Sequence, residues 1–306
     1  APGAVVEGLP TRRKAGCLAF VNIMYGCDNF CSYCIVPYVR GRERSRRPAD
    51  ILQEIEGLVD EGVREVTLLG QNVNSYGRGL DVDFATLLRQ VGEIEGLHRI
   101  RFMTSHPKDL SPDLIAAMAE TPKVCRHLHL PVQAGSNRIL SQMNRRYTRE
   151  QYLSLVARLR QAVPGIALTT DLIVGFPGET EEDFCDTLSL VEEVGFDSAY
   201  TFKYSRRTGT VAADLPGQVP EAEKKQRLAR LNALQDGITA AIQAAYEGTC
   251  QEVLAEGPSP RRKTQMCGRT STGKMVNFPG GPELIGQLVD VDITQSKAHT
   301  LAGKRK

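Results

Sequence analysis

Three cysteines, Cys27, Cys31 and Cys34, lie close together in the segment GCDNFCSYC, in the spacing C-x3-C-x2-C. A structural zinc site normally has a closed shell of four protein ligands in two pairs, and no second CxxC or HxxxH pair follows in this chain. A 4Fe–4S cluster held by only three thiolates keeps one iron free of protein ligands. The absence of a fourth cysteine therefore predicts a cluster whose open iron binds a substrate or a cofactor.

The other thiols and imidazoles do not complete this set. His106, His127 and His129 lie far along the chain on strand ends, and only coincidence would bring one of them to the cysteines. No signal-peptide pattern opens the chain, so a cytoplasmic location with reduced thiols is expected. Clustered thiols then indicate metal or redox chemistry. The scattered cysteines are interpreted as small buried apolar residues: Cys17, Cys125, Cys185, Cys250 and Cys267.

The net charge is only +2 over 306 residues, so the positive charge that matters is local. The segment RGRERSRR at 40–47 contains five arginines and a single acid, Glu43, and it follows the last of the three cysteines within six residues. Basic side chains beside a reactive centre predict an anionic substrate. Three shorter basic clusters, at 12–14, 261–263 and 304–306, are interpreted as solvated faces. No stretch approaches the roughly 20 apolar residues of a membrane span, and no membrane contact is expected.

The middle of the chain must position the cysteines, and it alternates short apolar strands with amphipathic helices. Strands are predicted at residues 18–24, 63–70, 98–104, 125–132, 166–176 and 197–205. Helices are predicted from near residue 49 and near 83–94, 112–120, 149–162 and 181–194, the last two with N-cap signals at Thr148 and Thr180. This alternation predicts an α/β fold with a partial (β/α)6 barrel. Because chemistry in such barrels lies at the carboxyl ends of the strands, the position of the cysteines after the first strand suits a reactive centre.

Beyond residue 206 the pattern changes. The segment 221–246 predicts a long helix with an apolar stripe, formed by Leu228, Leu231, Leu234, Ile238 and Ile242. From about Tyr246 short strands separated by Gly and Pro predict a small β-barrel of the kind that binds oligonucleotides. This part contains nine Lys or Arg residues against six Asp or Glu residues, a modest basic excess that fits a nucleic-acid partner.

The spacing of the cysteines, with Tyr33 before the last one, resembles the signature of the radical S-adenosylmethionine (radical SAM) enzymes. The position after the first strand and the β/α order are similar to that superfamily as well. The resemblance implies that the open iron chelates the methionine part of S-adenosylmethionine. One electron from the cluster then yields a 5′-deoxyadenosyl radical, while the protein positions the reactants and excludes water.

Further segments resemble the methylthiotransferases, and among them the MiaB-type enzymes that act on N(6)-dimethylallyladenosine of tRNA. These segments are LLGQNVNSYG, TSHPKDL, LHLPVQAGS, DLIVGFPGET and YSRRTGT, and the match runs from about Gly16 to Gly303. The resemblance implies a linker at 1–15, a radical SAM core at 16–245 and a TRAM RNA-binding domain, an OB-like β-barrel, at 246–306. It implies methylthiolation at carbon 2 of an adenosine beside the anticodon, a base that must be unstacked first. The implied partners are a tRNA anticodon stem-loop and an electron donor protein, and a monomer is expected.

The resemblance also implies roles for individual residues. Cys27, Cys31 and Cys34 would be the catalytic cluster ligands, and the backbone of Tyr33 would contact the adenine. The stretch Gly70, Gln71, Asn72 stands where the superfamily usually has an acid that holds the methionine amino group. Positions suited to the ribose and adenine, with turn formation as the alternative, are Gln133, Ser136, Gly175 and Ser205. Candidates for the RNA phosphate or the target base are Arg40, Asn74, Asp171 and Arg207, with an arginine ion pair as the alternative for Asp171.

One departure from the family concerns a second cluster. Family members have an N-terminal domain whose three cysteines hold the 4Fe–4S cluster from which sulfur is inserted, and the opening APGAVVEGLPTRRKAG resembles the linker after that domain. The interpretation is a chain that lacks this domain, binds one cluster and tRNA and cleaves S-adenosylmethionine, but does not insert sulfur alone.

Two other classes of function stay open at this stage. One is an RNA-binding protein whose three cysteines hold a structural metal cluster. The other is a radical enzyme that acts on a different target, such as threonylcarbamoyladenosine of tRNA or a ribosomal protein.

Overall fold

The computed structural model describes residues 16–260, 262 and 264–306. The expected linker at 1–15, with the basic cluster at 12–14, and two members of the basic cluster at 261–263 lie outside the described residues.

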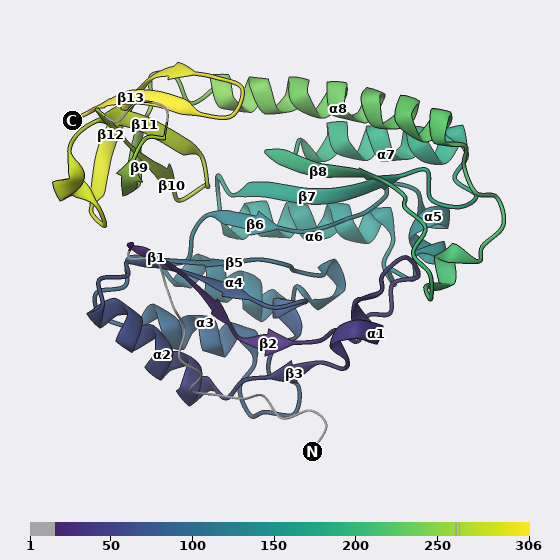
Figure 1. Cartoon of the computed structure of the whole chain (residues 1–306), viewed down its shortest axis with the longest axis horizontal. Helices are drawn as coiled ribbons and strands as arrows, with labels where there is room; N and C mark the ends of the chain where they lie inside the picture. The colour runs from purple at the N-terminus through teal and green to yellow at the C-terminus, as the bar shows by residue number, and fades with distance from the viewer. Residues whose placement is uncertain (1–15, 261, 263) are drawn as a thin grey trace.

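Six parallel strands form the framework of the first and larger part of the chain. One sheet has the order β1 (Leu18–Asn22), β4 (Glu65–Leu69), β5 (Arg99–Phe102). A second sheet has the order β6 (His127–His129), β7 (Ala167–Val174), β8 (Ser198–Lys203). A parallel bridge between Ile100 and Val124 joins the two sheets. The strands therefore follow one another in chain order from β1 to β8, as Figure 1 shows, which confirms the predicted partial barrel.

Helices connect these strands and cover the apolar side of the sheets. They are α2 (Pro48–Asp60), α3 (Phe84–Gly92), α4 (Pro112–Glu120), α6 (Arg149–Ala162), α7 (Glu181–Val194) and α8 (Glu221–Ala244). Thr148 and Thr180 each form the predicted capping box at the start of α6 and α7, which satisfies backbone donors that a helix start leaves free. A continuous core of buried side chains runs through both sheets and includes Val21, Leu68 and Leu172.

Some short elements were not expected from the sequence. They are α1 (Val36–Arg40), α5 (Asn137–Gln142), β2 (Met24–Tyr25), β3 (Arg44–Ser45) and the 3-10 turns η1 (Val73–Ser75), η2 (Pro107–Asp109), η3 (Val211–Ala213) and η4 (Pro282–Leu284). The single strand expected at 18–24 is wrong in one respect, because it breaks at Ile23 and β2 pairs instead with β3. Strand β3, the partner of β2, lies within the basic segment at 40–47, and the charge pattern alone did not indicate a strand there.

A closed five-stranded barrel forms the C-terminal part of the chain. Its strand order is β10 (Gln265–Thr270), β11 (Met275–Pro279), β13 (Leu301–Arg305), β12 (Leu288–Ser296), β9 (Cys250–Pro258). Side chains such as Val253, Phe278 and Ile293 fill its interior. The predicted small β-barrel is confirmed.

Polar contacts of two buried arginines attach this barrel to the larger part. Nη2 of Arg99 donates to the carbonyl and carboxylate of Glu252 at 3.0 and 2.9 Å, and Arg101 donates to the carbonyl of Thr270 at 2.7 Å. Arg99 begins β5, so the contact lies at the amino end of the parallel strands. In Figure 1 the barrel and α1 accordingly lie at opposite ends of the molecule. A partner that touches both must span the length of the strands.

The cysteines outside the clustered three differ in exposure. Cys17 and Cys125 are buried, as expected, but Cys185 and Cys250 are exposed and Cys267 is partly exposed, so the interpretation as buried residues is wrong for these three. Cys185 lies on α7, and its thiol donates to the carboxylate of Glu181 of the same helix at 3.7 Å.

None of the helices in the described part of the chain is long and apolar enough to span a membrane.

Candidate active site

The cysteine loop, residues 26–34, lies at the carboxyl end of β1 and is tied down at its start. The backbone N–H of Gly26 donates to the side-chain oxygen of Gln71 at 2.6 Å, and the N–H of Cys27 donates to the carbonyl of Gly41 at 3.2 Å. Gly26 has a φ of +78°, and a Cβ at this position would lie 2.0 Å from the carbonyl oxygen of Arg42. The loop can therefore begin in this conformation only with glycine.

Segments that follow three other strands also hold the loop. Ser32 donates from its N–H to the carbonyl of Met143 at 3.1 Å and from its hydroxyl to the carbonyl of Gln142 at 2.8 Å. Its own carbonyl accepts from the N–H of Ala212 at 2.8 Å. Together with Gln71 after β4, these contacts bring the segments after β4, β6 and β8 to the loop. The loop thus lies where the carboxyl ends of the strands converge.

The three thiols lie close enough to affect one another electrostatically. Burial raises the pKa of Cys27 to about 11 and also raises the pKa of Cys34, and the charges of neighbouring thiolates act in the same direction. Cys31 is buried. Anionic thiolates packed in this way need positive charge beside them, and a bound metal supplies it.

The donor set fits an iron–sulfur cluster better than a single ion. Among the described residues no three His, Cys, Asp or Glu side chains converge closely enough to hold one metal ion. A zinc ion requires such convergence, because the donor atoms of its four ligands all lie within about 2.3 Å of the metal. Three thiolates on one nine-residue loop suit the separate corners of a cluster.

Arg145, in the turn between α5 and α6, is a site residue that the sequence analysis missed. It is 4 % exposed and its Nη1 lies 3.4 Å from the Sγ of Cys31. Nη2 donates to the carbonyl of Pro131 at 2.7 Å, and Nε donates to the hydroxyl of Tyr147 at 2.9 Å. No carboxylate of the described residues pairs with Arg145. A buried guanidinium without a carboxylate is costly unless other groups compensate it, and the sulfur of Cys31 is one of the groups within its reach.

Tyr33 lies on the same side of the loop. Its hydroxyl is 3.5 Å from Nη1 of Arg145, and burial raises its pKa. The side chain packs against the cluster of buried apolar residues that contains Met143 and Phe176. Tyr33 therefore braces the loop with its ring and leaves its backbone beside Cys34.

Residues 70–72 contact two different parts of the protein: Gly70 and Gln71 lie against the segment that leads into the cysteine loop, and Asn72 lies against the segment after β5. Gln71 orients the start of the cysteine loop, as described, and a Cβ on Gly70 would lie 2.5 Å from the side chain of Met24. Asn72 is 1 % exposed, donates to the carboxylate of Asp109 at 2.7 Å and accepts from the N–H of His106 at 3.1 Å. Both polar groups of the Asn72 side chain are thus used within the protein, and its contact with the cofactor stays a prediction.

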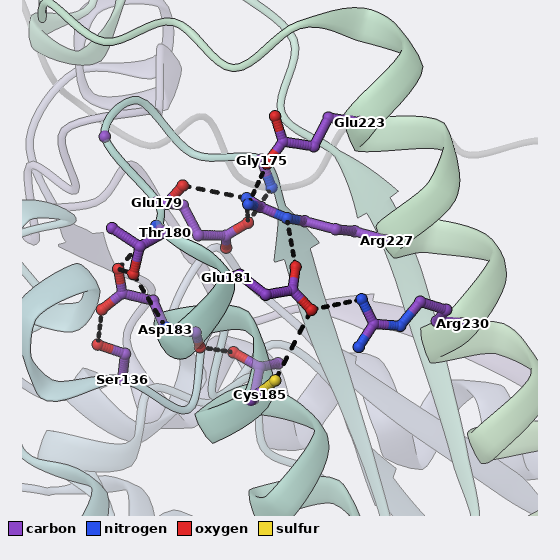
Figure 2. A network of polar contacts seen from close by, with 12 residues as sticks. Ser136, Gly175, Glu179, Thr180, Glu181, Asp183, Cys185, Glu223, Arg227 and Arg230 are labelled. Carbon is purple, nitrogen blue, oxygen red and sulfur yellow. Dashed lines mark hydrogen bonds and ion pairs between the residues drawn. The ribbon is translucent and has the colours of Figure 1, made fainter.

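The four positions expected near the ribose and adenine differ in burial, backbone conformation and hydrogen bonding. Ser136 caps α5 and donates to the carboxylate of Asp183 at 2.5 Å, so its hydroxyl serves the fold (Figure 2). Gln133 is buried with a φ of +76°, in a bridge with Leu172. Gly175 directly follows β7 and has a φ of +71°, and Ser205 is exposed after β8. The roles of Gln133, Ser136, Gly175 and Ser205 toward the cofactor stay predictions.

Of the residues expected to meet the substrate, Arg40, Asn74 and Arg207 lie in segments that follow strands of the first part, whereas Asp171 lies within β7. Arg40 and Arg207 are exposed, and the charge of Arg207 acts on Cys34. Asp171 pairs with no arginine in the described part; its Oδ1 lies 3.5 Å from Nε2 of His129. Both polar atoms of the Asn74 side chain are buried without a hydrogen-bond partner among the described residues. Since an unpaired buried amide costs free energy, Asn74 stays a candidate for a ligand contact.

Two family models match the chain. The model of the radical SAM superfamily matches residues 21–191, and the model of the TRAM domain matches residues 244–305.

Curated relatives match almost the whole chain. A tRNA-2-methylthio-N(6)-dimethylallyladenosine synthase of Moorella thermoacetica is 60% identical over 304 residues, and one of Syntrophomonas wolfei is 58% identical over 304 residues. Each alignment covers 99% of this chain and 68% of the relative. The chain thus spans about two thirds of the length of these relatives.

Solved structures support the fold alone. Coproporphyrinogen III oxidase of Escherichia coli superposes with a TM-score of 0.55 at 15% identity, over 83% of this chain and 67% of that chain. A radical S-adenosylmethionine methyltransferase of Kitasatospora setae also has a TM-score of 0.55, at 20% identity, over 69% of this chain and 39% of that chain.

Proposed function

Because the chain belongs to the radical SAM superfamily, and within it to the family of the tRNA-2-methylthio-N(6)-dimethylallyladenosine synthases, we propose that it catalyses the radical part of tRNA methylthiolation. The substrate is the N(6)-dimethylallyladenosine beside the anticodon, and the modified atom is carbon 2. The observation that carries the proposal is the cysteine loop, which presents three thiols at the carboxyl ends of the barrel strands, with no fourth protein ligand among the described residues.

Members of the superfamily use a 4Fe–4S cluster and S-adenosylmethionine, and the three thiols fit the cluster. When bound, the cluster supplies the electron that cleaves S-adenosylmethionine to the 5′-deoxyadenosyl radical. Cys27, Cys31 and Cys34 are the ligands in this proposal, and Arg145 supplies a positive charge beside Cys31. Tyr33 and the apolar residues packed around it exclude water from this side of the loop.

Exposed basic and aromatic side chains near the cysteine loop support an RNA partner. We name the exposed residues Tyr38, Arg40, Arg206 and Arg207 the rim surface. Its two segments meet, since a Cβ on Gly209 would lie 3.7 Å from the side chain of Ile35 at the start of α1. Arginines bind phosphates and an exposed tyrosine stacks on an unpaired base, which suits an anticodon loop.

The TRAM-matched barrel is the second RNA contact in this proposal. It lies at the far end of the strands, fixed there by Arg99 and Arg101. A stem-loop that reaches from the barrel to the rim surface would present its loop bases to the cysteine loop. Splaying out an unpaired loop base costs little compared with opening a duplex.

The proposal also covers the domain boundaries, the location in the cell and the oligomeric state. The radical SAM core extends over 16–245 and the RNA-binding domain over 246–306, supported by the break between the end of α8 and the start of β9. A tRNA substrate suits a cytoplasmic enzyme, which takes its electron from a donor protein and acts as a monomer.

The test uses the anaerobically reconstituted chain. We expect wild type to bind iron and sulfide and to release 5′-deoxyadenosine from S-adenosylmethionine under dithionite. Replacement of Cys31 by Ala should abolish both, whereas Cys185→Ala, an exposed cysteine on α7, should leave both unchanged. Zinc in place of iron, or iron without release of 5′-deoxyadenosine by the wild type, would instead indicate an RNA-binding protein with a structural metal centre.

A further inference from the structure

The sheet of β6, β7 and β8 has a second face, opposite to the one that the helices cover. Along β7 the residues Leu168 and Leu172 belong to the core beneath the helices, whereas Asp171 lies between them in sequence and points the other way. We name this side of the three strands the inner face. In register, its residues are His127, His129, Thr169, Asp171, Ile173, Ser198, Tyr200 and Phe202.

The amino end of the inner face is covered by the turn of the C-terminal barrel that joins β10 to β11. Oγ of Ser271 accepts from the N–H of Arg126 at 2.8 Å, and Nζ of Lys274 lies 2.7 Å from the carboxylate of Asp197. Beneath this turn, burial lowers the pKa of His127 to about 3. This end of the inner face is therefore closed to a ligand.

Two aromatic side chains farther along the inner face are left uncovered. Tyr200 is 55% exposed and Phe202 is 51% exposed. In a complete barrel the inward side chains pack against one another in layers. Large apolar side chains that lie exposed together indicate a binding surface, so this part of the inner face is suited to a ligand with an apolar group.

Beside Tyr200 the inner face presents a carboxylate with free acceptor capacity. Asp171 is the register partner of Tyr200, and its Oδ1 lies 3.5 Å from Nε2 of His129. No hydrogen bond from the described residues reaches this carboxylate. His129 is 6% exposed, its Nδ1 lies 3.0 Å from Oγ1 of Thr169, and its ring lies edge-on to Tyr200 with centroids 5.8 Å apart. His129 thus holds the carboxylate beside the tyrosine ring, where it can accept a hydrogen bond from a ligand.

The carboxyl end of this surface adjoins the cysteine loop. Ile173, the register partner of Phe202, packs against the same apolar cluster as Tyr33 of the loop. The segment after β8 also meets the loop, since the N–H of Ala212 donates to the carbonyl of Ser32 at 2.8 Å. A ligand on the two exposed rings therefore lies at the end of the inner face that is nearest to the three thiols.

The charge of this surface disfavours an anionic ligand group. The inner-face positions of β7 and β8 include one acid, Asp171, and no lysine or arginine. Arg101, on the neighbouring sheet, is engaged by Glu65 and by a carbonyl of the C-terminal barrel. A group that ends in a carboxylate would lose water beside an acid and two apolar rings, which costs free energy. An apolar group would gain free energy by covering the same rings.

We infer that Asp171, Tyr200 and Phe202 determine which N(6) substituent of the target adenosine is accepted. The carboxylate accepts the hydrogen bond that the secondary amine at N(6) donates, and the two rings cover the apolar dimethylallyl group. The same side chains reject the threonylcarbamoyl group, because it ends in a carboxylate. This inference rests on the proposed function, in which the target base lies at the cysteine loop, and it names the residues that distinguish the two adenosines.

The test measures binding of three anticodon stem-loops to the anaerobically reconstituted chain in the presence of S-adenosylmethionine. The stem-loops differ only in the target nucleoside, which is adenosine, N(6)-dimethylallyladenosine or N(6)-threonylcarbamoyladenosine. Fluorescence anisotropy gives the three dissociation constants, and the unfolding midpoint reports on folding.

The variants are Tyr200→Ala, Phe202→Ala and Asp171→Asn, the last of which keeps the size of the side chain and an acceptor oxygen but not the charge. Ser198→Ala is the control for truncation, because it lies on the same face of β8 at the covered amino end. Asp236→Asn is the control for the lost charge, because this acid is exposed on α8.

We expect wild type to bind the dimethylallyl stem-loop about tenfold more tightly than the unmodified one, and the threonylcarbamoyl stem-loop most weakly. Tyr200→Ala and Phe202→Ala should each lose most of the preference for the dimethylallyl group and bind the unmodified stem-loop as wild type does. Asp171→Asn should bind the threonylcarbamoyl stem-loop about tenfold more tightly than wild type does, since the repulsion between carboxylates is removed. Both controls should keep the wild-type ratios. Should one ring variant fail to fold, the other decides.

The possible failures are distinct. Wild-type ratios in the ring variants, or unchanged rejection of the threonylcarbamoyl stem-loop by Asp171→Asn, overturn this inference and leave the proposed function intact. Equal binding of the dimethylallyl and unmodified stem-loops by wild type also overturns this inference alone. A wild-type protein that binds none of the three stem-loops overturns the proposed function together with it.

Discussion

Nη1 of Arg145 lies 3.4 Å from Sγ of Cys31, although 114 residues separate them in the sequence. Both side chains are buried, and no carboxylate of the described residues pairs with the arginine. The guanidinium therefore donates to the sulfur of Cys31 across this separation. In this arrangement the protein holds a permanent positive charge beside one ligand of the proposed cluster.

The first prediction concerns this charge. Arg145→Met should retain clearly less iron after anaerobic reconstitution, because Cys31 loses its donor and the thiolates repel one another. Arg145→Lys should be intermediate, since it keeps the charge but not the planar set of donors that reaches Pro131 and Tyr147. Arg146→Met is the control, because this neighbouring side chain is exposed. Equal iron in the Arg145→Met and Arg146→Met proteins would contradict the prediction.

A second prediction concerns the start of the cysteine loop. Gly26→Ala should destabilise the fold by on the order of 2–4 kcal/mol, because the new Cβ collides with the carbonyl of Arg42 and the positive φ is strained. Gly195→Ala is the matched control: its φ is +60° and its ψ is +67°, yet nothing lies within 4 Å of the added Cβ, so only the left-handed strain of about 1–2 kcal/mol remains. Denaturant unfolding of both variants measures the difference. Equal losses would show that the collision relaxes at no cost.

The contact between the two parts of the chain supports a third prediction. Arg101→Met leaves the buried Glu65, 2.9 Å from Nε of Arg101, without its cation, and it should cost roughly 3–5 kcal/mol of unfolding free energy. Faster hydrogen exchange in residues 270–274 should accompany this loss, since their carbonyls lose donors. Arg89→Met, which breaks exposed pairs with Asp113 and Glu120, should cost far less unfolding free energy, because solvent screens such pairs. A similar small cost for Arg101→Met would mean that the charges are unimportant to the contact.

The pH dependence of stability gives a fourth prediction. Burial lowers the pKa of His106 to about 2, with help from the charge of Arg145, whereas a histidine in the unfolded chain titrates near 6.5. Below that pH the unfolded chain binds a proton that the folded chain does not. The stabilising contribution is therefore present above about pH 6.5 and is lost progressively as the pH falls towards about 2.

From about pH 7.5 to about pH 5, His106 should account for a loss of roughly 2 kcal/mol in urea unfolding. His106→Asn should lack this part of the loss, because asparagine keeps an acceptor for the N–H of Lys108 but does not titrate. His299→Asn, at an exposed position, should behave as wild type. An unaltered pH dependence in the His106→Asn protein would show that the group is protonated without cost.

The fifth prediction tests the rim surface. Arg207→Ala should weaken binding of an anticodon stem-loop and reduce the slope of log affinity against log salt by about 1, as expected for one lost phosphate contact. Arg158→Ala, on the exposed face of α6, should change neither. Fluorescence anisotropy at several salt concentrations measures both quantities. An unchanged slope for Arg207→Ala would remove this residue from the RNA contact.

Local pattern was enough to predict much of the fold. Strand β7 and helices α6 and α7 form where apolar spacing and capping residues indicate, because each depends on neighbours within a few residues. The shorter elements α1 and α5 were missed, since five and six residues are too few for a periodic pattern to show. Asn72 illustrates the limit at the site, because only the folded chain shows that His106 and Asp109 use both its polar groups.

The sequence by itself determined the three-thiol loop, its place after the first strand, the parallel β/α order and the C-terminal barrel. Only the tertiary structure decided which charges are buried and what they face: Arg145 at Cys31, Arg227 at Glu179, Arg99 at Glu252. The physical reason is that an arginine on a solvated face and an arginine in the interior have the same sequence signature. Their difference lies in which distant segments cover them and exclude water, and that is a property of the folded chain.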